Sequence, residues 1–324
     1  MKNKKINLKN ADRNTLALFG IAVVIFVVMG ILEPQAFLGV ANLQGMCIQF
    51  PEFGILAIGM MLAMMSGGID LSLVGIANFS SIVGTVVILR MGGSGAGILA
   101  GIVAALVIGA LCGIFNGFLV GYLKIPPMLV TLCGLQLYTG LGLAITKGPA
   151  LTGLPESFSL IANGVIANIP IAVMIFVAVA LGVAFLLRST VYGQHVSYMG
   201  TNDVASRYSG IDNLKITIIT YLTSGVLGSI GGILMASHYN SAKADYGSSY
   251  TLLTLLIAVL GGTDPDGGKG KVVGVCMAVI VLQLISSAFN IMRINSFLKT
   301  FIWGLLLLVI MIVTKMIENK KSTR

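Results

Sequence analysis

The sequence predicts an all-α, polytopic membrane protein of about ten transmembrane helices, some of them short or broken, with both termini in the cytoplasm. The 324 residues are 56% hydrophobic and only 10% charged, whereas soluble domains average about 25% charged residues. Apolar runs also recur along the whole chain. A soluble globule of this composition would lack polar surface, so we expect one transmembrane domain over 1–324, embedded in a lipid bilayer.

The individual spans follow from the apolar runs, because a helix needs about 20 residues to cross the hydrocarbon. Charged residues and Gly or Pro breaks separate ten such runs: 15–32, 51–66, 71–89, 97–122, 127–146, 168–187, 215–236, 250–262, 272–290 and 297–314. The second and the eighth are short, and each ends in Gly-Gly. We expect a broken or short helix at both places.

Basic residues set the expected orientation. With the N-terminus inside and ten alternating spans, 15 of the 20 Lys and Arg residues fall on the cytoplasmic side. This bias is the one that the positive-inside rule describes. It assigns three segments to the cytoplasm, which are the tails at 1–14 and 315–324 and the long loop at 188–215.

The first broken span ends in MSGGIDLS at 65–72. Gly67 and Gly68 weaken the helix, and irregular backbone at membrane depth is tolerated only inside protein or beside water. Asp70 and Ser72 can satisfy that backbone, and Asp70 can cap the following helix. Two roles for Asp70 remain open, a structural one and a place on a substrate route.

A similar ending recurs downstream, where Gly261 and Gly262 precede Asp264. Short or Gly-interrupted segments at related places in two halves point to a transport path. We interpret the recurrence as a possible internal repeat. Apart from Asp70 we expect no acidic side chain within the spans and no Lys, Arg or His there to pair with it, whereas ion-coupled carriers usually keep ionisable groups inside the bundle. An external energy source is therefore expected.

The loop at 188–215 contains a short predicted helix over 201–209. Asn202 or Thr201 can serve as its N-cap, and Gly210 ends it. This helix is too polar to enter lipid, and it suits docking into a groove of a soluble partner. An ordinary solvated connection is the alternative.

Several classes of function are not expected. The net charge of +9 is explained by topology, so we expect no nucleic-acid partner. Cys and His residues lack metal-ligand spacing, so no metal site is expected. The spans hold no Ser–His, His-rich or paired-carboxylate set, and GGTDPDGGKGK lacks the P-loop spacing. We expect neither an enzyme nor a chain that binds ATP or another cofactor itself.

Four segments together resemble a known family: SGGIDLS at 66–72, GIFNGFLVGYLKIPPMLVTL at 113–132, MGTNDVASRYSGI at 199–211 and AVLGGTDPDGGKGKVVG at 258–274. They resemble the permease subunits of bacterial ABC importers for simple sugars, a group that includes ribose, galactoside-type and autoinducer-2 systems. The segments follow the order found in that family and cover nearly the whole chain.

This resemblance implies a multi-pass permease of the bacterial inner membrane that works as a dimer, with a second copy or a paralogue. A cytoplasmic ABC ATPase would bind ATP and Mg, and an extracytoplasmic sugar-binding protein would deliver substrate. The residues expected to couple the permease to the ATPase are Gly193, Gly200, Asn202, Asp203, Ala205, Arg207, Ser209, Gly210 and Ile211.

Neutral hydrogen-bonding side chains suit the passage of a neutral sugar. Candidates for the translocation path, besides the residues of the two Gly-Gly breaks, are Asn78, Asn116, Thr131 and Gln136. Hydrogen bonding between helices is an alternative role for each of them. The alternative function for the whole chain is a self-sufficient secondary transporter or a channel for a small neutral polar solute.

Overall fold

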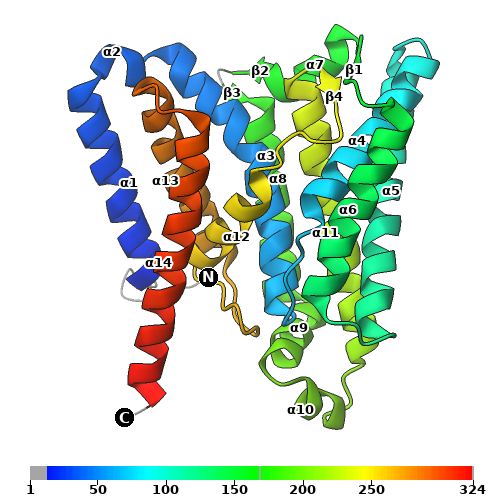
Figure 1. The fold of residues 1–324 in the computed structure, drawn as a ribbon, viewed down its shortest axis with the longest axis vertical. Helices are drawn as coiled ribbons and strands as arrows, with labels where there is room; N and C mark the ends of the chain where they lie inside the picture. Colours follow the sequence, from blue (N-terminus) through cyan, green and yellow to red (C-terminus); the bar gives the residue numbers. More distant parts are fainter. Residues whose placement is uncertain (1–12, 168, 323–324) are drawn as a thin grey trace, which may run out of the picture.

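The computed structural model describes residues 13–167 and 169–322, which fold into a bundle of helices (Figure 1). The helices are α1 (Arg13–Leu32), α2 (Pro34–Phe37), α3 (Val40–Met65), α4 (Leu73–Arg90), α5 (Gly95–Gly121), α6 (Pro127–Thr146), α7 (Glu156–Asn163), α8 (Ile171–Ser189), α9 (Val191–Thr201), α10 (Asp203–Tyr208), α11 (Asn213–His238), α12 (Tyr250–Leu260), α13 (Val272–Ile291) and α14 (Ser296–Ser322).

Four strands of two residues each lie at one end of the bundle. The strand β1 (Leu151–Thr152) pairs antiparallel with β4 (Ser241–Ala242), and β2 (Val165–Ile166) pairs antiparallel with β3 (Ile169–Pro170). Figure 1 shows α7, β1 and β4 at this end and α10 at the opposite end. The beginning of α1 and the end of α14 point toward the end that carries α10, so the described chain starts and finishes on one side.

The predicted all-α membrane architecture is confirmed in outline. Within residues 13–167 and 169–322, eight helices are long and apolar enough to cross a membrane, and α12 and the apolar part of α14 are shorter. Each of the ten predicted runs contains one helix. The expected tail at 1–14 lies mostly outside the described residues, and α14 continues through most of the expected tail at 315–324.

One of the two predicted short spans is wrong. The helix α3 has 26 residues and includes Pro51 in its interior, so at 1.5 Å per residue it is about 39 Å long. The prediction began at 51 because Pro and the polar residues before it resemble a loop. Proline is tolerated within membrane helices where neighbours satisfy the freed backbone group. The other predicted short span is confirmed, because α12 has 11 residues.

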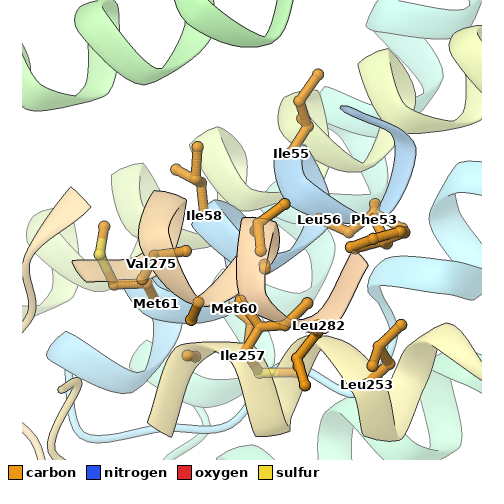
Figure 2. Packing of buried hydrophobic residues seen from close by; sticks show 14 of the residues in the cluster. Phe53, Ile55, Leu56, Ile58, Met60, Met61, Leu253, Ile257, Val275 and Leu282 are labelled. Carbon is orange, nitrogen blue, oxygen red and sulfur yellow. The ribbon is translucent and has the colours of Figure 1, made fainter. Parts of the chain in front are cut away.

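The core forms around α3. In the most apolar 18-residue stretch of α3, 78% of the residues are buried, compared with 17% in that of α1. Figure 2 shows side chains of α3 packing against Leu253 and Ile257 of α12 and against Val275 and Leu282 of α13. On its other sides α3 packs against α8 and α11. The outer helices α1, α5, α6 and α8 expose apolar side chains, as expected of helices that face lipid or another membrane chain.

Glycines at a spacing of four on α5 bring this helix against α11. An added Cβ at Gly113 would lie 2.2 Å from the backbone oxygen of Tyr221, and one at Gly109 would lie 1.7 Å from Ser229 Oγ. From the other side, a Cβ at Gly225 would lie 2.2 Å from the backbone oxygen of Gly109. This close approach confirms the role of small residues in packing membrane helices.

We predict that Gly113→Ala destabilises the bundle, because the new methyl group would push α5 away from α11. The free energy of unfolding should fall by about 1–3 kcal/mol, measured by thermal or denaturant unfolding in detergent. Gly140→Ala on α6 is the matched control, because nothing lies within 4 Å of its Cβ position. Equal stability of the two variants would contradict the packing described here.

Candidate functional site

The candidate site is centred on Asp70, in the turn between α3 and α4. Its side chain is completely buried. One carboxylate oxygen accepts hydrogen bonds from the Ser72 backbone N–H (3.1 Å) and from Ser72 Oγ (2.6 Å), and the other accepts from Ser224 Oγ of α11 (2.7 Å). The buried carboxylate is therefore held by three donors.

Hydrogen bonds extend from Ser72 across two further helices. Asn116 of α5 donates to Ser72 Oγ (2.8 Å), and the Tyr138 hydroxyl of α6 donates to the side-chain oxygen of Asn116 (2.8 Å). Separately, Thr131 of α6 donates to the backbone oxygen of Ile69 (2.8 Å). Four of the sequence-predicted path residues, Asp70, Ser72, Asn116 and Thr131, thus come together at one turn and tie α4, α5, α6 and α11 to it.

The structural role of Asp70 differs from a simple helix cap. Its carboxylate accepts a hydrogen bond from the N–H of Ser72, which is the N-cap residue of α4. The Ser72 side chain makes no capping hydrogen bond to the first turn of that helix. Asp70 therefore joins the turn to α11 as well as preceding α4. A place on the substrate route stays a prediction.

Tyr221 of α11 is a neighbour that the sequence did not indicate. Its hydroxyl is buried and has no hydrogen-bond partner in the described part of the chain. An added Cβ at Gly68 would lie 2.6 Å from this hydroxyl and 2.8 Å from Pro127 Cβ. Gly68 thus lets α6 and α11 each come close to this turn, while Gly67, with φ of +87°, turns the chain at the end of α3.

The two Gly-Gly breaks form the same turn, but the match is offset by one residue. Gly67 and Gly262 both have positive φ, +87° and +85°. The next residue in each case donates back to a helix carbonyl, Gly68 to Ala63 at 3.1 Å and Thr263 to Ala258 at 3.0 Å. The first Gly of one pair therefore matches the second Gly of the other.

This offset separates the two aspartates. Asp264 lies one residue closer to its glycine turn than Asp70 does to Gly67. It accepts from the Asp266 N–H (3.1 Å) and lies 3.7 Å from the ammonium group of Lys269. Asp264 is thus held by its own loop, unlike Asp70.

Three segments meet at what we call the glycine junction, formed by Met65, Gly67, Gly200, Gly267 and Gly268. The Gly268 N–H donates to the Met65 carbonyl (3.0 Å). An added Cβ at Gly200 would lie 1.9 Å from that carbonyl and 2.6 Å from the nitrogen of Gly268. The junction joins the end of α3, the end of α9 and the loop after α12, and its backbones touch because no side chains intervene.

The predicted short helix in the loop at 188–215 is confirmed. Its N-cap is Asn202, whose side chain accepts from the Ala205 N–H (2.9 Å), and Gly210 follows its end with φ of +81°. Arg207 pairs with Asp203 at 3.2 Å on the surface. Of the predicted coupling residues, those on the surface are Asn202, Asp203, Ala205, Arg207, Ser209 and Gly210.

A second helix in this loop, α9, was not predicted. It anchors α10 to the bundle through Gly200 at the junction and through Tyr192, whose hydroxyl lies 2.8 Å from Thr220 Oγ1 of α11. Burial raises the pKa of Tyr192 to about 12, so it remains a neutral hydrogen-bonding group. Gly193 is buried against Leu187, and Ile211 is half-buried.

Two predicted path residues lie elsewhere. Asn78 of α4 donates to the backbone oxygens of Ala244 and Tyr246, both at 2.9 Å, and so fixes the segment after β4. Gln136 is exposed on α6, on a different side of that helix from buried Thr131 and Tyr138, and it does not join the Asp70 network. Hydropathy locates a helix but does not say which face is inward.

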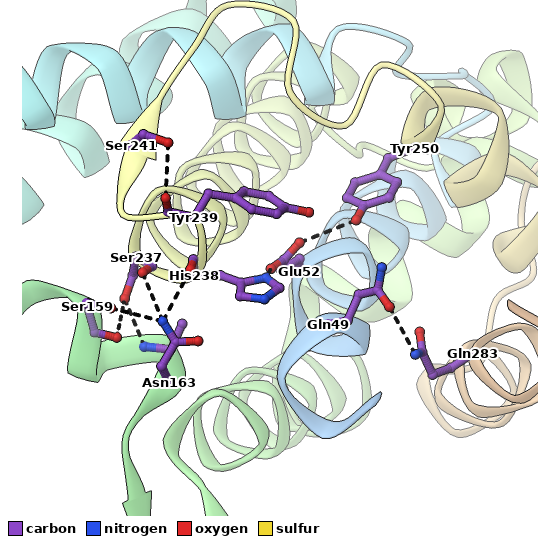
Figure 3. A network of polar contacts seen from close by, with 11 residues as sticks. Gln49, Glu52, Ser159, Asn163, Ser237, His238, Tyr239, Ser241, Tyr250 and Gln283 are labelled. Carbon is purple, nitrogen blue, oxygen red and sulfur yellow. Dashed lines mark hydrogen bonds and ion pairs between the residues drawn. The ribbon is translucent and has the colours of Figure 1, made fainter. Parts of the chain in front are cut away.

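The expectation that Asp70 is the only acid within the spans is wrong. Glu52 of α3 is completely buried, bonds to His238 Nδ1 of α11 and accepts from the Tyr250 hydroxyl of α12 (3.3 Å) (Figure 3). Glu52 lies within the predicted span at 51–66, so the signal was present. His238 gave no signal, because it is far from Glu52 in sequence.

Across residues 13–167 and 169–322, no group of three or more His, Cys, Asp or Glu side chains is placed to hold a metal ion.

Comparison with protein-family models gives a match over residues 42–313 to the permease component of branched-chain amino acid transport systems. The match covers α3 to most of α14 and includes both glycine turns. The chain belongs to this family. As a permease component whose described residues include eight helices able to span a membrane, it is a multi-pass protein of the inner membrane.

Individual relatives cover nearly the whole permease. The ribose import permease protein of Bacillus subtilis (strain 168) is 30% identical over 303 residues, or 92% of this chain and 91% of the relative. The L-arabinose transport system permease protein of Escherichia coli (strain K12) is 30% identical over 300 residues, or 93% and 90%. The ribose import permease protein of Escherichia coli (strain K12) is 29% identical, with 92% of both chains covered. No solved structure matches the chain significantly.

We predict that Asp70→Leu destabilises the permease, because Ser72 and Ser224 would lose a buried acceptor. The free energy of unfolding should fall by about 1–3 kcal/mol. Asp70→Asn keeps a side-chain oxygen in place and should lose less. Thermal unfolding of the purified variants measures both. If Asp70→Leu were as stable as the wild type, the hydrogen bonds at this turn would not stabilise the bundle.

Proposed function

We propose that the chain is the permease subunit of an ATP-driven, binding-protein-dependent importer of a simple sugar, such as a pentose, a hexose or an autoinducer-2-like compound. Membership of the permease family and the sugars for which the ribose and arabinose relatives are named support a sugar substrate. The family model is named for branched-chain amino acids, but the ribose and arabinose relatives, which each match more than nine-tenths of this chain, are named for sugars.

The observation that supports coupling to a separate ATPase is the exposed helix α10, which α9 connects to the glycine junction through Gly200. A surface groove of about 360 Å³ lies beside α10 and is lined by Lys124, Arg207 and Asp212 among others. An exposed polar helix with an adjacent groove suits a soluble protein partner. The ATPase would bind ATP and Mg, and displacement of α10 would reach the core through Gly200 and Met65.

The rest of the assembly follows the same proposal. An extracytoplasmic binding protein would deliver the sugar at the end that carries α7 and β4. A second copy of the permease, or a related permease, would complete the transmembrane pathway. Alternating access driven by ATP requires no ion relay, although Glu52 shows that the bundle does contain a second buried acid.

Reconstitution distinguishes this proposal from a secondary transporter. The permease is placed in vesicles with its ATPase and its binding protein, and accumulation of labelled ribose, arabinose, xylose and galactose is measured. We expect accumulation only with ATP, the ATPase and the binding protein together. Accumulation by the permease alone on a proton or sodium gradient would contradict the proposal, and so would failure of the full complex to accumulate any sugar.

We predict that Gly200→Ala uncouples ATP hydrolysis from transport, because the methyl group would force α9 away from the end of α3. Sugar accumulated per ATP hydrolysed should fall about tenfold, as expected for a change of ~1.4 kcal/mol in the coupling. The ATPase should still co-purify. Gly182→Ala on α8 is the control, because nothing lies within 4 Å of its Cβ position. Normal coupling in Gly200→Ala would contradict a mechanical role for the junction.

A further inference from the structure

A stripe of polar side chains runs along one face of α3. Asn42, Gln49 and Glu52 are seven and three residues apart, so they lie on the same side of the helix. We call them, with the polar residues that face them, the polar stripe. It lies in the half of the bundle away from α10, where α3 begins (Figure 1).

Partners from three other helices face the stripe. Ser287 of α13 donates to Asn42 Oδ1 (3.0 Å), and Gln283 of α13 donates to Gln49 Oε1 (3.2 Å). Tyr250 of α12 and His238 of α11 bond to Glu52, as Figure 3 shows. The members of the polar stripe are therefore Asn42, Gln49, Glu52, His238, Tyr250, Gln283 and Ser287.

The stripe is not fully satisfied. Gln283 is 4% exposed, and its Oε1 atom is buried without a hydrogen-bond partner in the described part of the chain. A buried acceptor without a partner is destabilising, so retaining it here needs another reason. The side chain of His238 is 26% exposed, so the stripe also reaches the surface. An unused acceptor and an opening are features of a binding surface rather than of inert packing.

The stripe ends at an apolar barrier. Beyond Glu52 the buried residues of α3 are apolar from Phe53 to Met65, and α12 and α13 pack on them. Ser66 Oγ donates to the Ala63 carbonyl of the same helix, and Asp70 is the next residue whose side chain bonds to another helix. A polar solute that enters along the stripe would reach Glu52 and stop there until the helices move.

We propose that the polar stripe is the outer half of the translocation route and contacts the hydroxyl groups of a neutral sugar. This inference rests on the proposed function for its orientation and its substrate class. A carboxylate accepts hydrogen bonds from adjacent hydroxyls, and amide side chains both donate and accept. Tyr250 and Tyr239 add aromatic faces, and Tyr239 stacks on His238 with ring centroids 4.7 Å apart.

The first experiment compares Gln283→Leu and Glu52→Gln with the wild type in the full reconstituted complex. The sugar probe is whichever of ribose, arabinose, xylose and galactose the wild type accumulates best. We expect uptake to fall about tenfold or more, the effect of losing one good hydrogen bond to the solute. Co-purification of the ATPase and thermal stability should be retained.

Thr85→Val is the matched control for Gln283→Leu. Thr85 is also a buried polar residue whose side-chain oxygen has no partner among the described residues, but it lies on α4, away from the stripe. Uptake by Thr85→Val should equal that of the wild type. Wild-type uptake by both Gln283→Leu and Glu52→Gln would overturn the assignment of the stripe.

A second experiment locates the route without reference to the sugar. In a chain whose four native cysteines are replaced by alanine, Ser287→Cys is compared with Ser229→Cys, a buried serine packed against α5. A membrane-impermeant thiol reagent is added from outside, with and without ATP. We expect Ser287→Cys to react in at least one of these states and Ser229→Cys in neither.

The two arms separate failure of this inference from failure of the proposed function. If Ser287→Cys reacts in neither state, the stripe is not an outer route, even if the complex imports sugar. If the wild-type complex accumulates no sugar while Ser287→Cys reacts from outside, the proposed substrate class is wrong and the location of the route stands.

Discussion

The fold depends on one constraint, which is that a buried polar group inside a membrane protein must find its partners within the protein. The constraint is strongest at the turn after α3, because this turn buries the carboxylate of Asp70. Three donors satisfy that carboxylate, and they can reach it only if α4 and α11 are in their observed places. The relative positions of these helices and the turn are therefore mutually dependent.

The helix α11 connects the two buried acids. It reaches Asp70 through Ser224 and Glu52 through His238, and these contacts are about 21 Å apart along the helix. Between them Gly225 brings the backbone of α11 against Gly109 of α5, and Gly232 brings it against Ala77 of α4. A shift of α11 along its axis would strain both acid sites at once, so changes at one end of the bundle are transmitted to the other.

Much of the fold could be predicted from the sequence because hydropathy and length report directly on spans. The helices within the ten runs and the short α12 were found in this way, whereas Asn202 was one of two caps predicted from residue preferences at helix ends. The true start of α3 could not be, because its polar residues are covered by α13, a tertiary contact that no local pattern encodes. The same reason explains why the sequence could not tell Gln136 from Asn116. Both are amides within spans, but Asn116 lies on a buried face of its helix and Gln136 on an exposed one.

The two Gly-Gly pairs match with an offset of one residue. Letter matching aligned Asp70 with Asp264, whereas the backbone aligns Gly67 with Gly262. What recurs is thus the helix-ending turn and not the acid. The turn after α12 leads into the loop whose Gly268 bonds to Met65, directly before the turn after α3. Gly200 of α9 touches the same carbonyl. A displacement of α10 would therefore move the end of α3 and the loop after α12 together. These two helices line the inner limit of the polar stripe.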